Sequence, residues 1–132
     1  MMRLVEVATV PGKKKIFAIT SRGRAELRTW IRPPLPQSTA KPTFDPVRTR
    51  MSFLAALSPA KRARFVAVAR ENNAREIAQL RQKLRNLDRR VDAFEYLVTI
   101  AVLDEARARA RWLLYVAKEL RRVTPTATPE SD

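Results

Sequence analysis

The chain has 132 residues, 45% of them hydrophobic, and carries 27 Lys and Arg against 13 Asp and Glu, but no Cys and no His. This composition is typical of a folded protein, and it excludes a disulfide framework, a thiolate metal site and the usual histidine general base. Because no apolar run reaches the roughly 18 residues of a membrane span and no secretory signal pattern opens the chain, we expect a soluble, cytoplasmic protein of one domain's length.

The first predicted element is a β-hairpin. Residues 4–10 and 16–20 mix β-branched and polar residues in loose alternation, and Pro11, Gly12 and three lysines lie between them. Two short β-forming segments around a Pro-Gly turn are typical of a hairpin. Since a two-stranded hairpin is not stable alone in water, it must pack against helices.

A helix is predicted over residues 21–32, with Thr20 or Ser21 as its N-cap. Leu27, Trp30 and Ile31 have the spacing of one buried helix face, which places Trp30 in the core. We expect a glycine in the first turn, Gly23, to serve close packing.

Residues 33–46 contain five of the nine prolines and are predicted to form an extended connector. Asp45 followed by Pro46 is typical of an N-cap with Pro at the first helical position, and predicts a helix that runs past Met51 to Leu57. Ser58-Pro59 repeats this start signal for a longer helix.

The remaining chain is predicted to form two long helices, because no Gly or Pro occurs between residues 60 and 124. Ordinary helix lengths favour a break between Asp88 and Asp92. From Ile77 onward the apolar residues follow steps of three and four, which residues 91, 94 and 98 continue, as in the packing seam of a coiled coil. The second helix, near residues 92–122, is predicted to bury Leu97, Ile100, Leu103, Leu113, Leu114 and Leu120.

The positive charge is concentrated in the first two thirds of the chain. Residues 1–40 have a net charge of +6, residues 41–90 of +9 and residues 91–132 of −1. This distribution favours a polyanionic partner, and the excess of Arg over Lys favours nucleic acid, since Arg contacts phosphates in a bidentate manner. The alternative is that a GC-rich genome simply favours Arg and Ala.

One segment resembles a known family. Residues 15–31 contain an aromatic residue, then Ile-Thr, a glycine, a leucine and a Trp-Ile pair that precedes prolines; these are Phe17, Ile19, Thr20, Gly23, Leu27, Trp30, Ile31, Pro33 and Pro34. This pattern resembles the wing-to-helix signature of PadR-like transcriptional regulators, although the family aromatic is usually Tyr. Residues 96–98 and 110–113, the latter with Trp112, resemble the long helices of the family's C-terminal region.

The resemblance implies a mainly α fold, in which a short β-hairpin wing is followed by long helices that form a helical dimerisation domain. It implies a partial winged helix over 1–32, the connector at 33–46, the helical dimerisation domain at 47–123 and a disordered tail at 124–132. In the family, a helix-turn-helix precedes the wing, whereas this chain begins at the wing. We therefore expect the DNA-reading helices to be missing, through a fragment, a misplaced start or a natural truncation.

Without those helices, the hairpin is expected to keep a partly exposed apolar face. Leu4, Val7, Ile16 and Ile19 would normally cover the helix-turn-helix core.

The resemblance also implies site residues. The expected DNA contacts, all to phosphates, are Lys13, Lys14 and Lys15 at the wing tip and Arg22 and Arg24 beside it. The alternative is that these charges are only solvated. The expected dimer interface consists of Leu97, Ile100, Leu103, Trp112, Leu113 and Leu120.

Three further groups of side chains have open roles. Trp112 lies at a dimer seam, in a small apolar pocket or in the core. Arg107 and Arg111 share a helix face and are expected to pair with Asp104, Glu105 or another subunit. The many basic residues of the helix after Pro59 are expected to form a solvated polar face, with contact to DNA left open.

Three functions stay open. The first is a dimeric PadR-like regulator that binds double-stranded DNA and has a small-molecule effector of unknown identity. The second is a helical interaction module without DNA readout, and the third is a basic RNA-binding protein. An enzyme is not expected, because the chain has only two Gly, no phosphate-binding loop and no recognisable nucleophile. No cofactor and no metal are expected.

Overall fold

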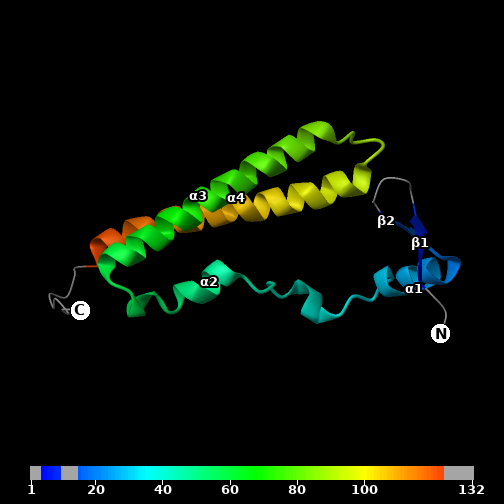
Figure 1. The fold of residues 1–132 in the computed structure, drawn as a ribbon. Coiled ribbons are helices and arrows are strands. Elements are labelled where there is room, and N and C mark those ends of the chain that lie inside the picture. Colours follow the sequence, from blue (N-terminus) through cyan, green and yellow to red (C-terminus); the bar gives the residue numbers. More distant parts are fainter. Residues whose placement is uncertain (1–3, 10–14, 124–132) are drawn as a thin grey trace. The chain divides into compact units, whose positions relative to one another are not determined.

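The computed structural model describes residues 4–9 and 15–123, and its described part is mainly α-helical with one β-hairpin, as predicted (Figure 1). The chain forms two compact units, Met1–Thr43 and Phe44–Asp132. The boundary between them lies inside the predicted connector. The predicted tail, residues 124–132, lies outside the described residues.

The first unit contains the predicted hairpin and the helix after it. Strand β1 (Val5–Thr9) pairs with strand β2 (Lys15–Ile19) in antiparallel register, and helix α1 (Ser21–Ile31) follows directly. A short 3₁₀ helix, Gln37–Ala40, lies beyond the first prolines. The turn of the hairpin lies outside the described residues.

The hairpin presents an exposed apolar row. Val5 is paired with Ile19 and Val7 with Phe17, and paired residues share one face of an antiparallel sheet. All four are exposed, which agrees with the expected exposed apolar face. In the backbone register Ile16 pairs with Ala8, and the predicted exposure of the Ile16 side chain falls outside what the structure describes.

The predicted burial of one face of α1 is wrong. Leu27, Trp30 and Ile31 are all exposed, and Trp30 keeps 79% of its accessible surface. The helical spacing was read correctly, but burial needs a second layer. Among the described residues, the first unit offers α1 only a two-stranded hairpin, which covers its first turn.

The second unit begins with short helices. Asp45 caps α2 (Pro46–Met51) by accepting from the backbone N–H of Val47 at 2.9 Å and of Arg48 at 3.2 Å. The predicted continuation to Leu57 is wrong, because a 3₁₀ helix, Leu54–Ala56, follows a break. The Arg62 side chain donates to the carbonyl oxygens of Leu54 and Ala55, and so stabilises this tighter turn.

The two long helices form an antiparallel hairpin, α3 (Pro59–Asn86) and α4 (Ala93–Arg122), which lie side by side in Figure 1. Ser58 caps α3 as predicted, by accepting from the N–H of Lys61. The buried residues follow heptad steps on both helices: Val66, Ala69, Asn73 and Leu80 on α3, and Thr99, Leu103, Ala106 and Leu113 on α4. This spacing is typical of two helices that pack along one seam.

The turn between α3 and α4 lies where it was predicted. Asp88 accepts from the backbone N–H of Arg90 at 2.7 Å, and Asp92 accepts from the N–H of Asp88 at 3.0 Å. Aspartates that bond nearby backbone amides offer the chain an alternative to the helix. These two side chains therefore account for the break without Gly or Pro.

The seam does not continue through the turn as predicted. Val91, Phe94 and Val98 extend the rhythm in the sequence, yet all three are exposed. Of the leucines predicted to be buried in α4, Leu97 and Leu114 are also exposed. The reason is that the turn resets the helical phase, so that α4 meets α3 with the side that carries Thr99, Leu103 and Ala106.

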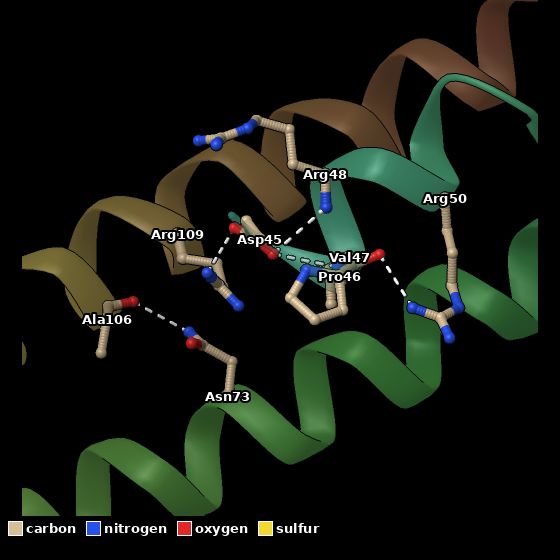
Figure 2. Close-up of polar contacts among 8 residues, drawn as sticks. All are labelled: Asp45, Pro46, Val47, Arg48, Arg50, Asn73, Ala106 and Arg109. Atoms are coloured by element: carbon tan, nitrogen blue, oxygen red, sulfur yellow. Dashed lines mark hydrogen bonds and ion pairs between the residues drawn. The ribbon is translucent and has the colours of Figure 1, made fainter. Parts of the chain in front are cut away.

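Two polar contacts fix the packing of the second unit (Figure 2). The buried side-chain amide of Asn73 on α3 donates to the backbone oxygen of Ala106 on α4 at 2.9 Å. Arg109 on α4 forms an ion pair with Asp45, whose side chain is only 11% exposed. Asp45 therefore has two roles, because it caps α2 and also ties the start of α2 to α4.

We predict that Asp45→Ala and Asp45→Asn differ in stability. Asp45→Ala removes the cap, worth about 0.5–2 kcal/mol, and leaves the half-buried Arg109 without its partner. Asp45→Asn keeps an equally good capping oxygen and loses only the ion pair. Urea unfolding of the full chain, followed by circular dichroism, should rank wild type above Asn and Asn above Ala.

Asp104→Asn is the matched control. It removes the exposed pair between Asp104 and Arg107, which are 3.7 Å apart, and should cost no more than about 0.5 kcal/mol. Equal losses for Asp45→Asn and Asp45→Ala would contradict the capping role.

Candidate nucleic-acid interface

The hairpin and α1 are joined through Thr20. Its hydroxyl donates to the Leu4 carbonyl oxygen at 3.0 Å and accepts from the backbone N–H of Gly23 at 3.0 Å. The backbone N–H of Thr20 also donates to the Leu4 oxygen, at 3.2 Å. One threonine therefore caps α1 and holds it to the chain segment that enters β1.

Gly23 is the one buried residue of α1. A Cβ atom there would lie 2.1 Å from the Leu4 carbonyl oxygen and 2.9 Å from Cγ1 of Ile19. No side chain fits at these distances, so the close approach of α1 to the hairpin requires glycine. The expectation that Gly23 serves close packing is confirmed, and it explains the Thr-x-x-Gly spacing of the sequence.

Arg22 and Arg24 flank this contact. Each is adjacent in sequence to Gly23 and therefore lies about 100° from it around the helix. Both are exposed, and the first turn of α1 contains no acidic residue. A helix N-terminus carries partial positive charge, so two arginines there form an anion-attracting end beside the hairpin.

The predicted wing-tip lysines lie at the edge of the described structure. Lys13 and Lys14 lie outside the described residues, whereas Lys15 is the first residue of β2 and pairs with Thr9. The structure therefore links Lys15, through β2, to the end of α1 that carries Arg22 and Arg24. Contact of these five residues with DNA stays a prediction.

The six predicted dimer-interface residues fall into two groups. Leu103 and Leu113 are buried within the single chain, and Leu113 is fully buried. Leu97 is 62% exposed, and Ile100, Trp112 and Leu120 are half-buried. Leu103 and Leu113 therefore stabilise the helical hairpin itself, and contact of the other four residues with a second chain stays a prediction.

Sequence reasoning missed a second apolar stripe on α4. Six residues at steps of three, four and seven lie on the side opposite the α3 seam: Phe94, Val98, Ala101, Ala108, Trp112 and Tyr115. Phe94 is the most exposed of them, at 84%. The signal was present, because these positions repeat in heptads half a helical turn away from Leu103 and Ala106. Of the six, Phe94 and Val98 were assigned to the seam with α3 and Trp112 to the dimer interface, so the stripe as a whole was missed.

Acidic side chains near the α3–α4 turn have structural partners. Asp88 and Asp92 accept backbone amides, and Glu95 pairs with Lys83. Among the described residues, no group of three or more acidic side chains has the arrangement of a metal site. Within the same residues, no helix has the length and apolar character that crossing a bilayer requires.

No protein-family model matches this chain, and no curated protein is similar to it in sequence. Solved structures are similar in fold. Bacillus subtilis PadR in complex with operator DNA matches 89% of this chain and 70% of its own, with a TM-score of 0.65 and 21% identity. The same protein in complex with p-coumaric acid matches 89% and 69%, with a TM-score of 0.66 and 19% identity.

A PadR-like transcriptional regulator from Bacillus cereus matches 92% of this chain and 70% of its own, with a TM-score of 0.65 and 19% identity. These matches cover about nine tenths of the chain. The chain therefore has the PadR-like fold, in agreement with the resemblance seen in the sequence.

We predict that Gly23→Ala destabilises the first unit. In an ordinary exposed helix, replacing Gly by Ala stabilises the helix by about 1 kcal/mol. At Gly23 we expect the opposite, a loss of stability. The cause is the collision of the new Cβ with the Leu4 oxygen. Amide hydrogen exchange should become faster at Thr20, Arg24 and the β1–β2 pairs.

Ala25→Gly is the control, because it removes a methyl group from an exposed position of the same helix. It should weaken α1 slightly and leave the hairpin amides unchanged. Unchanged or slower exchange in Gly23→Ala would show that the close approach to Leu4 does not hold the hairpin.

Proposed function

We propose that this chain acts in transcription regulation as a PadR-like DNA-binding protein. The observation that carries the proposal is the hairpin joined to the basic start of α1, in a chain whose fold is similar to that of PadR, a protein solved with operator DNA. The net charge of +14 supports a polyanionic partner.

The proposed contacts are electrostatic. Lys13, Lys14 and Lys15 reach phosphates from the hairpin, and Arg22 and Arg24 do so from the start of α1. Sequence readout needs an element that enters the major groove and contacts base edges. The described residues supply the hairpin and α1 beside it, so we expect this chain by itself to bind duplex DNA weakly and without sequence preference.

Dimerisation is the second part of the proposal. The second apolar stripe of α4 exposes Phe94, Val98 and Tyr115 to solvent, and burying such surface against a second copy is favourable by about 25 cal/mol per Å². A two-fold axis would place the stripe of one chain against that of the other. Two copies would also double the number of phosphate contacts.

The small-molecule effector belongs to the same proposal. Bacillus subtilis PadR has been solved with p-coumaric acid, which supports an effector of unknown identity for this chain.

An interaction module without DNA readout is the alternative. The exposed apolar row of Val5, Val7, Phe17 and Ile19 and the exposed Trp30 favour it, because these surfaces need a protein layer to cover them. In that case the chain would pair with a longer relative through α4. The third function, RNA binding, has only the positive charge in its favour.

We predict weak duplex binding through the hairpin. A dissociation constant of roughly 10⁻⁴ to 10⁻⁶ M at physiological salt is expected for non-specific contact. Replacing Lys13, Lys14 and Lys15 by Ala should flatten the dependence of log affinity on log salt by about 0.9 per lost contact, equally for all sequences. Fluorescence anisotropy of labelled duplexes at several salt concentrations measures this.

The charge-matched control replaces Arg111, Lys118 and Arg121, which are exposed on α4, by Ala. It removes the same charge and should change the slope much less. Tight binding of one operator over scrambled DNA would contradict the proposed electrostatic mode.

We also predict that the chain is a dimer at concentrations on the order of tens of micromolar. Light scattering should give twice the mass of one chain, and Phe94→Asp with Val98→Asp should reduce it to the monomer mass. Val68→Asp, on the exposed side of α3, should leave the dimer intact. A monomer mass for the wild-type chain would overturn the proposed interface.

A further inference from the structure

The two long helices differ sharply in charge. Helix α3 carries eight Lys and Arg against two Glu, a net charge of +6, whereas α4 carries six basic against four acidic residues, a net charge of +2. The basic residues of α4 all lie beyond residue 106, since residues 93–106 carry three acidic residues and no basic one. Exposed apolar side chains show the opposite distribution, because most of them lie on α4. Helix α4 exposes its apolar stripe, whereas the one large hydrophobic side chain of α3 that is exposed is Val68, at 40%.

Most of the charge of α3 is not used inside the protein. Arg62 bonds the carbonyl oxygens of Leu54 and Ala55, and Lys83 pairs with Glu95. Five other basic side chains are exposed and form no hydrogen bond or ion pair with the described residues: Lys61, Arg64, Arg70, Arg75 and Arg81. A row of unpaired arginines is costly in self-repulsion, which a polyanion relieves.

The arginines form two rows along α3. Arg64 and Arg75 are eleven residues apart, as are Arg70 and Arg81. Eleven residues are close to three helical turns, so each pair lies on one side of the helix with about 16 Å between its members. The first row lies away from the seam with α4, and the second lies along its flank. The helix therefore fixes the spacing of the four backbone positions that carry these arginines.

We propose that the exposed face of α3 is a second surface for duplex DNA, which contacts the phosphate backbone separately from the hairpin and the start of α1. The choice of DNA as the partner rests on the proposed function, whereas the surface itself rests on the charge and exposure of α3.

Two features favour phosphates over other acidic partners. The excess of Arg over Lys suits the bidentate contact that a phosphate accepts. A helix that binds a membrane surface needs an exposed apolar face, but the apolar residues of α3 are consumed by the seam with α4. A protein partner that binds in a helical groove would also need such apolar anchors.

The experiment compares two charge-matched triple variants of the full chain. The test variant replaces Arg64, Arg75 and Arg81 by Ala, and the control is the α4 variant at Arg111, Lys118 and Arg121. Ala is the best helix former, so both variants should keep their helical circular dichroism. Each is titrated into a labelled random-sequence duplex at several salt concentrations.

We expect the α3 variant to bind about tenfold to a hundredfold more weakly at physiological salt, with a salt slope smaller by up to about 2.7. The α4 control should change affinity much less. Equal effects of the two variants would overturn the inference, because they would show a dependence on net charge alone.

Further comparisons distinguish failure of the α3 surface from failure of the proposed function, and DNA from other partners. If the variant at Lys13, Lys14 and Lys15 binds DNA like wild type while the α3 variant binds more weakly, the proposed hairpin contact is wrong and the α3 surface is supported. The reverse result overturns the α3 surface alone. Tighter binding to single-stranded RNA, or to vesicles that contain phosphatidylserine, than to the duplex would overturn the assignment to DNA.

Discussion

The packing of α3 on α4 is the interaction on which the second unit depends. Heptad spacing gives each helix one apolar side, and the aspartate-capped turn lets the chain fold back so that the two sides meet. The buried Asn73 donates to the Ala106 oxygen across this seam. A buried amide that is satisfied in only one alignment fixes the register of two helices, because a shifted register would leave it unpaired.

This seam determines which surfaces the hairpin of α3 and α4 exposes to partners. Once α3 uses its apolar side against α4, its remaining surface is basic, and the apolar residues that α4 has in excess face solvent. The hairpin of α3 and α4 therefore has a basic outer surface on α3 and an apolar outer surface on α4. Such a division suits two different partners, a polyanion on α3 and a second copy of the chain on α4.

The first unit depends on a smaller contact. Thr20 and Gly23 bring the start of α1 against Leu4 and Ile19, and this junction positions Arg22 and Arg24 beside the hairpin. The apolar row of the hairpin and the face of α1 with Trp30 are left uncovered within the described residues. A hairpin with one helix has too little surface to enclose them.

Most helices and strands, and most of their ends, could be predicted from local sequence patterns. Proline, glycine and capping residues act over a few positions, so Thr20, Asp45 and Ser58 marked helix starts correctly. The pattern from Phe17 to Pro34 indicated the PadR-like fold. Only the tertiary structure decided which apolar residues are buried. Leu97 and Leu113 look alike in the sequence, but one is exposed and the other fully buried, because the turn at Asp88 sets which side of α4 meets α3. The pairing of Arg109 with Asp45, 64 residues away, was equally out of reach, since helical periodicity carries no information on contacts between distant segments.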